Sequence, residues 1–179
     1  MTDAFCVRFL MTMKNKTRFI TQGAILAAAY VALTHLQNFL LPGSASAAIQ
    51  VRVSEALSIF AFFTPAAIPG LALGCAIFNL TSGMALPLDF LFGSIATALA
   101  ATCMWLSRKW TVFGTPVFGL IMPAVFNGLL IGWELSLFIG GGFFVNCGYV
   151  ALGEIIALML GLPLYWAMKK AWPKLHKNS

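Results

Sequence analysis

Charge is what this sequence has least of. Only 9% of its 179 residues are charged, and 5 acidic residues stand against 11 lysines and arginines. Hydrophobic residues make up 60% of the chain, and the mean hydropathy is +0.91. Soluble domains have a different balance of charged and apolar residues. The composition therefore excludes an ordinary soluble fold and predicts an integral membrane protein.

Several motifs of enzymes and metal sites are also missing. There is no GxxxxGK[ST] segment, and the glycine triplet at Gly140 is not followed by lysine, so this route of ATP hydrolysis is excluded. No HExxH occurs, and the isolated His35 is interpreted as a packed or capped histidine. We expect no catalytic residue, metal or cofactor; an intramembrane aspartyl-type enzyme is the enzymatic alternative. The cysteines have no paired spacing and are interpreted as small buried hydrophobic side chains: Cys6, Cys75, Cys103 and Cys147.

The strict polar–apolar alternation of a membrane β-barrel is absent too. What the chain has instead is long apolar blocks broken by proline, glycine and charge, and blocks of about 18 residues or more predict spanning helices. We therefore predict an all-α integral membrane protein, a bundle of six transmembrane helices. The expected helices are 20–41, 50–63, 68–84, 88–106, 116–138 and 143–168. A basic leader (1–19) and a basic tail (171–179) flank the helical domain (20–170).

The basic residues predict the orientation of this bundle. With six spans, the leader, the Arg108–Lys109 connection and the tail all fall on one side of the membrane. Positive charge marks the cytoplasmic side, so both termini are expected to be cytoplasmic. Two alternatives concern the leader and the first loop. Met11 or Met13 could be the true start, and Ala45–Ala47 resembles a signal-peptide cleavage site, although the apolar block before it is long for a signal core.

Three small residues share one face of the first predicted helix. Ala24, Ala28 and Ala32 recur at a spacing of four. Such a row allows another helix to approach closely. The partner helix could belong to this chain or to another protein.

Polar residues gather in the outer half of the predicted bundle. A carboxylate at bilayer depth costs several kcal/mol unless it is paired or lines a wet cavity. The pattern predicts an outward-facing cavity for a cationic ligand or one rich in N–H donors; a structural ion pair of Arg52 with Glu55 or Asp89 is the alternative. The outer residues are Arg52, Glu55, Asn79, Asp89, Glu134 and Asn146, and the deeper ones are Asn127 and Glu154.

Five segments give the chain a resemblance to a known family, over about Thr21 to Lys170. They are Gln50–Leu57, Phe63–Gly70, Gly74–Leu80, Asp89–Ser94 and Asn146–Glu154. In order and in sequence, these segments resemble the signature of the QueT family of membrane proteins.

The resemblance implies the substrate-binding S component of an energy-coupling factor (ECF) transporter in a prokaryotic plasma membrane. Its cargo would be a queuosine precursor such as 7-aminomethyl-7-deazaguanine, and its partners a transmembrane T component and two ATPases. Docking in such systems uses an AxxxA row on the first helix, the place that Ala24, Ala28 and Ala32 occupy. Release would follow tipping of the bundle in the membrane, and Pro42–Ile49 would act as a lid.

For this ligand, we expect Glu134 or Glu154 to contact the base edge and Glu55 or Asp89 to contact the amine, with Arg52 orienting Glu55. Further polar contacts are assigned to Asn79, Asn127 and Asn146. Three other functions stay open: an S component for another substrate, a stand-alone proton-coupled carrier using Glu134 and Glu154, and a structural membrane protein without a ligand.

Overall fold

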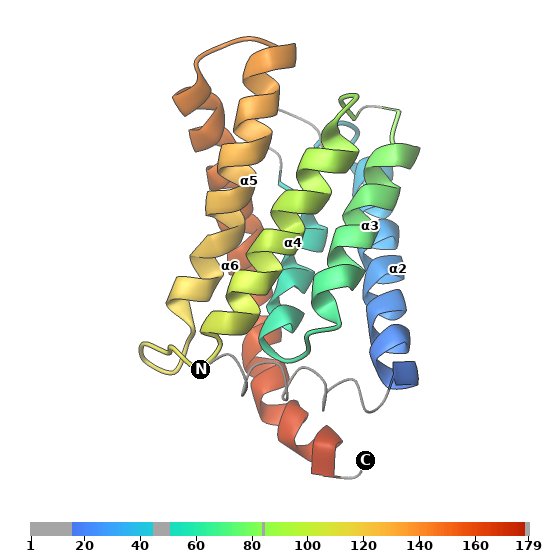
Figure 1. Cartoon of the computed structure of the whole chain (residues 1–179), viewed down its shortest axis with the longest axis vertical. Coiled ribbons are helices and arrows are strands. Elements are labelled where there is room, and N and C mark those ends of the chain that lie inside the picture. Colours follow the sequence, from blue (N-terminus) through green and yellow to red (C-terminus); the bar gives the residue numbers. More distant parts are fainter. Residues whose placement is uncertain (1–15, 45–50, 84, 178–179) are drawn as a thin grey trace.

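The computed structural model describes residues 16–44, 51–83 and 85–177, except for the side chains of 173–177. Within these ranges the chain is helical, and the only β pairing is an isolated bridge between Val112 and Thr115. The prediction of an all-α fold is confirmed for this part of the chain. The helices, labelled as in Figure 1, are α2 (Lys16–Leu40), η2 (Val53–Phe62), α3 (Ala67–Thr81), α4 (Asp89–Ser107), α5 (Val117–Phe138) and α6 (Phe143–Lys177).

Proline and glycine set several of these boundaries. Pro65 and Pro87 stand two residues before α3 and α4, and Pro116 immediately precedes α5. Proline has no N–H and a fixed φ, so it fits the entry to a helix better than its interior. The turn between α5 and α6 requires φ values of 90° at Gly140 and 85° at Gly141, a region that glycine adopts without steric cost.

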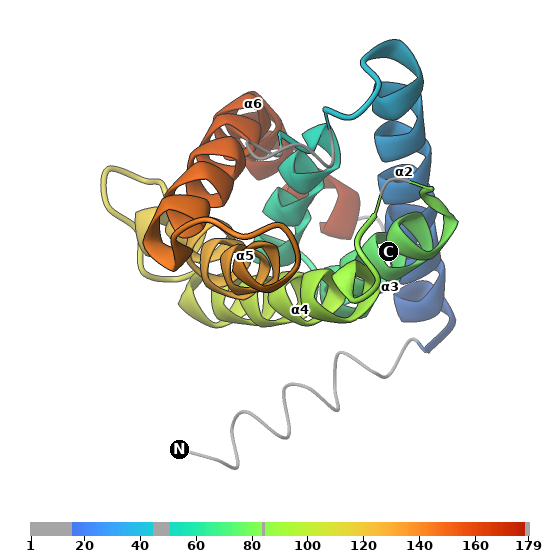
Figure 2. The same ribbon diagram turned by 90° about the horizontal axis from the view of Figure 1, so that it is seen from above.

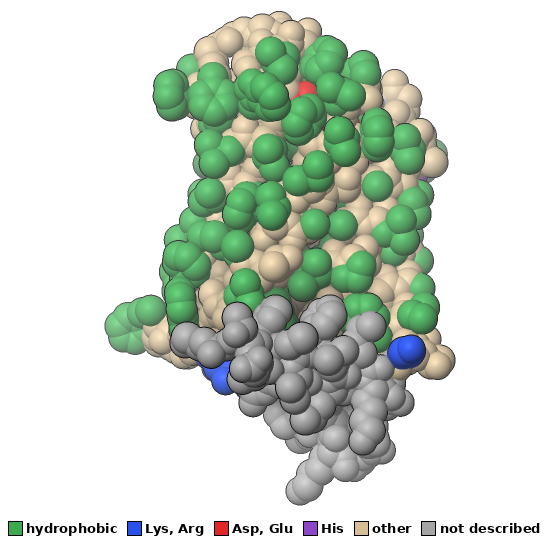
Figure 3. Space-filling view, in the orientation of Figure 1, with side chains coloured by type: hydrophobic (Ala, Val, Ile, Leu, Met, Phe, Trp, Pro, Cys, Tyr) green, Lys and Arg blue, Asp and Glu red, His purple; other side chains and the backbone are tan. Residues whose placement is uncertain are grey.

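Four helices, α2, α4, α5 and α6, are long and apolar enough to cross a membrane, whereas η2 and α3 are shorter apolar helices. The visible face in Figure 3 is covered by hydrophobic side chains over most of its height, with lysine and arginine near its lower end. The described residues therefore form a multi-pass membrane bundle. That η2 and α3 also cross the bilayer stays a prediction.

Consecutive helices pack against each other from α2 to α3, α4, α5 and α6, with η2 contacting α2, α3, α4 and α6. Seen from above, α2 to α6 form an arc that is open between α6 and α2, and η2 lies on the inner side of this arc (Figure 2). Most residues of η2 are consequently buried against the other helices, although Val53 is 38% exposed.

The second predicted helix differs from expectation in type. Residues 53–62 form a 3₁₀-helix, where an α-helix is expected from Gln50 to Phe63; Gln50 itself lies outside the described residues. A 3₁₀-helix rises about 2.0 Å per residue and an α-helix about 1.5 Å, so ten residues reach about 20 Å instead of about 15 Å. The Ser58 hydroxyl donates to the Glu55 carbonyl at 2.6 Å, a three-residue spacing that suits this tighter helix.

The lysines and arginines near the helix ends gather at one end of the bundle. The start of α2, the α4–α5 connection and the end of α6 lie at one end of the bundle (Figure 1), and these segments carry Lys16, Arg18, Arg108, Lys109, Lys169 and Lys170. The α3–α4 and α5–α6 connections lie at the other end. The predicted leader up to residue 15, the Ala45–Ala47 segment and most of the Pro42–Ile49 lid lie outside the described residues.

Candidate functional site

Arg52 is the one buried lysine or arginine of the described residues, with 5% of its surface exposed. It lies directly before η2, with Nη1 3.7 Å from the Cys75 sulfur and its guanidinium 5.7 Å from the centre of the Phe78 ring. Its charge acts on four carboxyl groups, all of them buried: Glu55, Asp89, Glu134 and Glu154. The fold thus brings acids from η2, α4, α5 and α6 around a single arginine.

Glu55 is held by α2. The Tyr30 hydroxyl donates to Glu55 Oε1 at 2.5 Å, and both side chains are buried. Nearby, Thr34 donates to the Ser54 hydroxyl at 2.7 Å. Gln37 continues this face, accepting the Val53 N–H at 2.8 Å. These hydrogen bonds therefore connect the buried face of α2 to the start of η2.

Asn79 and Asp89 meet where α3 ends and α4 begins. Asn79 Nδ2 donates to the Asp89 carbonyl at 2.9 Å, and the Leu86 N–H donates to Asp89 Oδ2 at 2.8 Å. Gly93 allows this approach, because a Cβ there would lie 2.9 Å from Asn79 Nδ2 and 3.2 Å from Cys75 Sγ. Asp89 therefore has one oxygen fixed by the backbone, while Oδ1 is buried without a hydrogen-bond donor from the described residues.

Glu134 is fully buried near the end of α5. Its polar neighbours are the Asp89 carboxyl and the Leu88 backbone, and Asp89 is the charged group that acts on it most strongly. Neither Glu134 oxygen meets a donor in acceptable hydrogen-bond geometry within the part of the chain that the structure describes. An ionised carboxylate only accepts hydrogen bonds, so two such groups side by side cannot satisfy each other.

Asn127 and Glu154 form a second polar pair, between α5 and α6. Asn127 Nδ2 donates to Glu154 Oε1 at 2.9 Å, and both residues are 4% exposed. Glu154 Oε2 is buried and has no donor among the described residues. Glu55 and Arg52 are the charged groups that act on Glu154, so this pair belongs to the same cluster.

The hydrogen bond that Asn146 makes does not involve the acidic cluster. Its Nδ2 donates to the Gly140 carbonyl at 3.1 Å, and the side chain is only half-buried. It closes the turn between α5 and α6. A direct contact of Asn146 with a ligand stays a prediction.

Six buried side-chain oxygens have no hydrogen-bond donor among the described residues. An unsatisfied buried polar group costs about 1–3 kcal/mol, and more when it is charged. A ligand bound beside the five of these oxygens that belong to Asn79, Asp89, Glu134 and Glu154 would have to supply N–H or O–H donors, and positive charge would be favoured. The six atoms are Asn38 Oδ1, Asn79 Oδ1, Asp89 Oδ1, Glu134 Oε1, Glu134 Oε2 and Glu154 Oε2.

Sequence reasoning missed the polar face of α2. Tyr30, Thr34 and Gln37 are spaced by four and three residues, which places them on one side of a helix. All three are buried. This polar stripe inside an apolar helix was the available signal. Cys75, expected to be a buried hydrophobic side chain, is buried but also contacts Arg52 and Asn79.

The alanine row lies on the other side of α2. Ala24, Ala28 and Ala32 are exposed, whereas α2 packs on α3 through buried positions that include Gly23 and Ala27. Packing within the described chain therefore does not account for the row.

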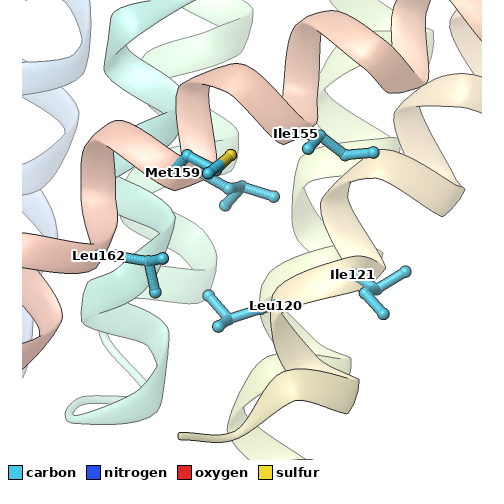
Figure 4. A pocket seen from close by; sticks show the side chains of 6 residues that line it. Leu120, Ile121, Ile155, Met159 and Leu162 are labelled. Carbon is cyan, nitrogen blue, oxygen red and sulfur yellow. The ribbon is translucent and has the colours of Figure 1, made fainter.

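Two surface grooves between α5 and α6 have a different character. One, of about 430 Å³, runs past Gly128, Gly148 and Ala151. The other, of about 140 Å³, is lined by Leu120, Ile121, Ile155, Leu158, Met159 and Leu162, five of which are labelled in Figure 4. The linings of both grooves are apolar, so they suit hydrocarbon and not a ligand that needs hydrogen bonds.

The fold is that of a multi-pass membrane protein that buries four carboxyl groups around one arginine. The family model described as QueT transporter matches residues 20–170, and the chain belongs to the QueT transporter family. Comparisons with curated proteins and with solved structures gave no match.

Proposed function

We propose that this protein is the substrate-binding S component of an energy-coupling factor importer that carries 7-aminomethyl-7-deazaguanine or a closely related deazapurine. Membership of the QueT transporter family supports transport of a small molecule. The observation that carries the proposal further is the set of five buried oxygens on Asn79, Asp89, Glu134 and Glu154 that have no donors among the described residues. A deazaguanine has several ring and amino N–H groups, so it complements such a surface.

The Asn127–Glu154 pair is the best candidate for the edge of the base. A carboxylate can accept two parallel N–H bonds, and an amide can both donate to a carbonyl and accept from an N–H. Glu154 Oε2 offers a buried acceptor next to Asn127, and Asn79 Oδ1 offers another. Tyr30 holds Glu55 in place on η2.

Energy would come from partner proteins, a transmembrane T component and two ATPases. The exposed row of Ala24, Ala28 and Ala32 is the proposed docking face. The basic end of the bundle would be cytoplasmic by the positive-inside rule, which puts both termini inside and the Asp89–Glu134 end outside. Substrate would enter from outside and leave after the docked bundle tips over.

Binding of a ligand panel to detergent-purified protein tests this proposal. The panel contains 7-aminomethyl-7-deazaguanine, 7-cyano-7-deazaguanine, guanine, adenine and riboflavin, measured by calorimetry and native mass spectrometry. We expect the deazaguanines to bind more tightly than adenine and riboflavin. Preference for riboflavin, or no binding by any purine or deazapurine, would overturn it.

A single substitution tests where the base lies in the site. Glu154→Gln keeps the size of the side chain but replaces one acceptor oxygen with a donor. It should weaken binding of every deazaguanine by about ten- to a hundredfold, since hydrogen bonds to charged groups contribute about 1.5–3 kcal/mol. Unchanged affinity would remove Glu154 from the site.

A further inference from the structure

Glu134 and Asp89 form a site that is distinct in its chemistry from the Asn127–Glu154 pair. Glu134 comes from α5 and Asp89 from the first turn of α4, with exposures of 0% and 2%. Three oxygens of these two side chains have no donor among the described residues: Glu134 Oε1, Glu134 Oε2 and Asp89 Oδ1.

Apolar side chains lie beside this pair of acids, and a backbone hydrogen bond holds one of them in place. Ile131 and Leu135 flank Glu134 on α5, and they form an apolar cluster with Val150, Leu86 and Phe92. The Leu86 N–H holds Asp89 Oδ2, which leaves Oδ1 as the available acceptor. The nearest buried positive charge, Arg52, also acts on Glu55 and Glu154. Arg52 is therefore shared among four acids and does not balance Glu134 and Asp89 by itself.

We propose that the Glu134–Asp89 pair binds a primary ammonium group of the transported molecule, an inference that rests on the proposed function. A primary ammonium is compact, carries a full positive charge and has three N–H donors. Three acceptor oxygens match these donors in number, and the negative charge of the two acids is opposite in sign to that of the ammonium. Charge-assisted hydrogen bonds are stronger than neutral ones, and burial of both acids strengthens them further.

A metal ion fits the site less well. The described residues contain no group of three or more His, Cys, Asp and Glu side chains that could hold one. An organic cation carried on a larger substrate needs only the two acids, because its remaining contacts are made elsewhere on the molecule. In the proposed cargo, the aminomethyl group meets Glu134 and Asp89 while the base meets Asn127 and Glu154.

Two ligands that differ only in this group test the inference. 7-Aminomethyl-7-deazaguanine carries the ammonium, and 7-cyano-7-deazaguanine replaces it with a neutral nitrile that donates no hydrogen bond. Both are titrated against wild type, Glu134→Gln, Asp89→Asn and Glu154→Gln, each checked for a wild-type elution profile. Wild type should bind the aminomethyl compound at least about tenfold more tightly than the cyano compound.

The variants divide the site into its two parts. Glu134→Gln and Asp89→Asn should lose about ten- to a hundredfold of aminomethyl affinity and change cyano affinity by less than about threefold. Glu154→Gln should weaken both ligands alike. Equal loss of both ligands in Glu134→Gln would overturn the ammonium site while leaving the proposed function standing. If a variant fails to fold, equal affinity of wild type for the two compounds would likewise overturn the ammonium site. Binding of neither compound to wild type would overturn the proposed function itself.

Discussion

At the scale of single residues, the contact between Tyr30 and Glu55 shows how the site is held. The Tyr30 hydroxyl donates to Glu55 Oε1 at 2.5 Å, and it comes from a different helix. Removal of the Tyr30 hydroxyl leaves the buried Glu55 Oε1 with one hydrogen-bond donor fewer. A buried group that loses its partner costs more than the net value of the hydrogen bond.

We therefore expect Tyr30→Phe to lower the free energy of unfolding by about 1–3 kcal/mol. Denaturant titration of the purified protein in detergent measures this. Tyr149→Phe is the matched control, because Tyr149 is 44% exposed on α6. Equal stability of the two variants would show that the Tyr30–Glu55 bond contributes nothing.

That the acids are buried near one another could be predicted at this scale. In a chain with so few charges, each acid placed within a predicted span is conspicuous, and the structure does bury Glu55, Asp89, Glu134 and Glu154 around Arg52. What the sequence could not supply is which acid lies beside which. That depends on how α4, α5 and α6 are rotated about their axes, and such rotation is set by packing across helices far apart in sequence.

At the scale of elements, glycines decide how closely α2 and α3 approach. A Cβ on Gly70 would lie 2.6 Å from the Gly23 carbonyl oxygen, a backbone atom that cannot simply turn away. Gly148, on α6, has no atom within 4 Å of the same hypothetical Cβ. The same substitution should therefore have opposite effects at the two positions.

We expect Gly70→Ala to destabilise the protein by about 1–3 kcal/mol, because overpacking forces the backbones apart. Gly148→Ala should be neutral or should stabilise by up to about 1 kcal/mol, as alanine does in an exposed helix. Unfolding in detergent measures both. A Gly70→Ala protein as stable as Gly148→Ala would contradict the close α2–α3 contact.

A substitution on the exposed face of α2 tests the proposed docking role. Ala28→Trp adds a large side chain at the centre of the exposed row of Ala24, Ala28 and Ala32. It should abolish ATP-dependent uptake and co-purification with the T component, since a small-residue contact leaves no room for an indole. Substrate binding by the isolated protein should not change, because the row faces away from Tyr30 and Thr34.

Leu99→Trp on α4 serves as the control, since Leu99 is also exposed on an apolar helix. It should retain uptake. Full uptake by Ala28→Trp would remove the alanine row from the docking surface.

A comparison of the predicted and observed helices shows which features could be read from the sequence. Proline, glycine and apolar length placed α2, α3, α4 and α5 near their observed bounds, because those signals are local. They also placed the start of α6, but this helix continues to Lys177, past its predicted end at residue 168. The 3₁₀ form of residues 53–62 was not predicted. The segment contacts α2, α3, α4 and α6, and contacts with helices far away in the chain cannot be read from the segment's own sequence.

At the scale of the whole molecule, charge is divided between the two ends of one bundle. Basic residues mark the end where α2 begins and α6 finishes, and Asp89 and Glu134 lie toward the opposite end (Figure 1). Under the proposed function, such a bundle takes up a donor-rich solute from one side. Moving the solute to the other side against its gradient requires an energy source.

The source of energy for uptake distinguishes the proposed S component from a stand-alone carrier. A proton-coupled carrier would take up substrate in response to a pH gradient without any other protein. An S component would bind substrate but accumulate it only with its T component and ATPases. We expect proteoliposomes containing this chain alone to show no uptake of 7-aminomethyl-7-deazaguanine under an imposed pH gradient.

Adding the T component and both ATPases, with ATP on their side of the membrane, should give uptake that Ala28→Trp prevents and Leu99→Trp retains. Glu134→Gln should reduce this uptake at low substrate concentration, and the uptake should recover as the concentration rises, because the substitution weakens binding and leaves docking intact. Uptake by the chain alone, driven by the pH gradient and lost in Glu134→Gln and Glu154→Gln, would instead identify the two acids as a proton relay. The same set of variants therefore assigns the acidic cluster to ligand binding or to proton transfer.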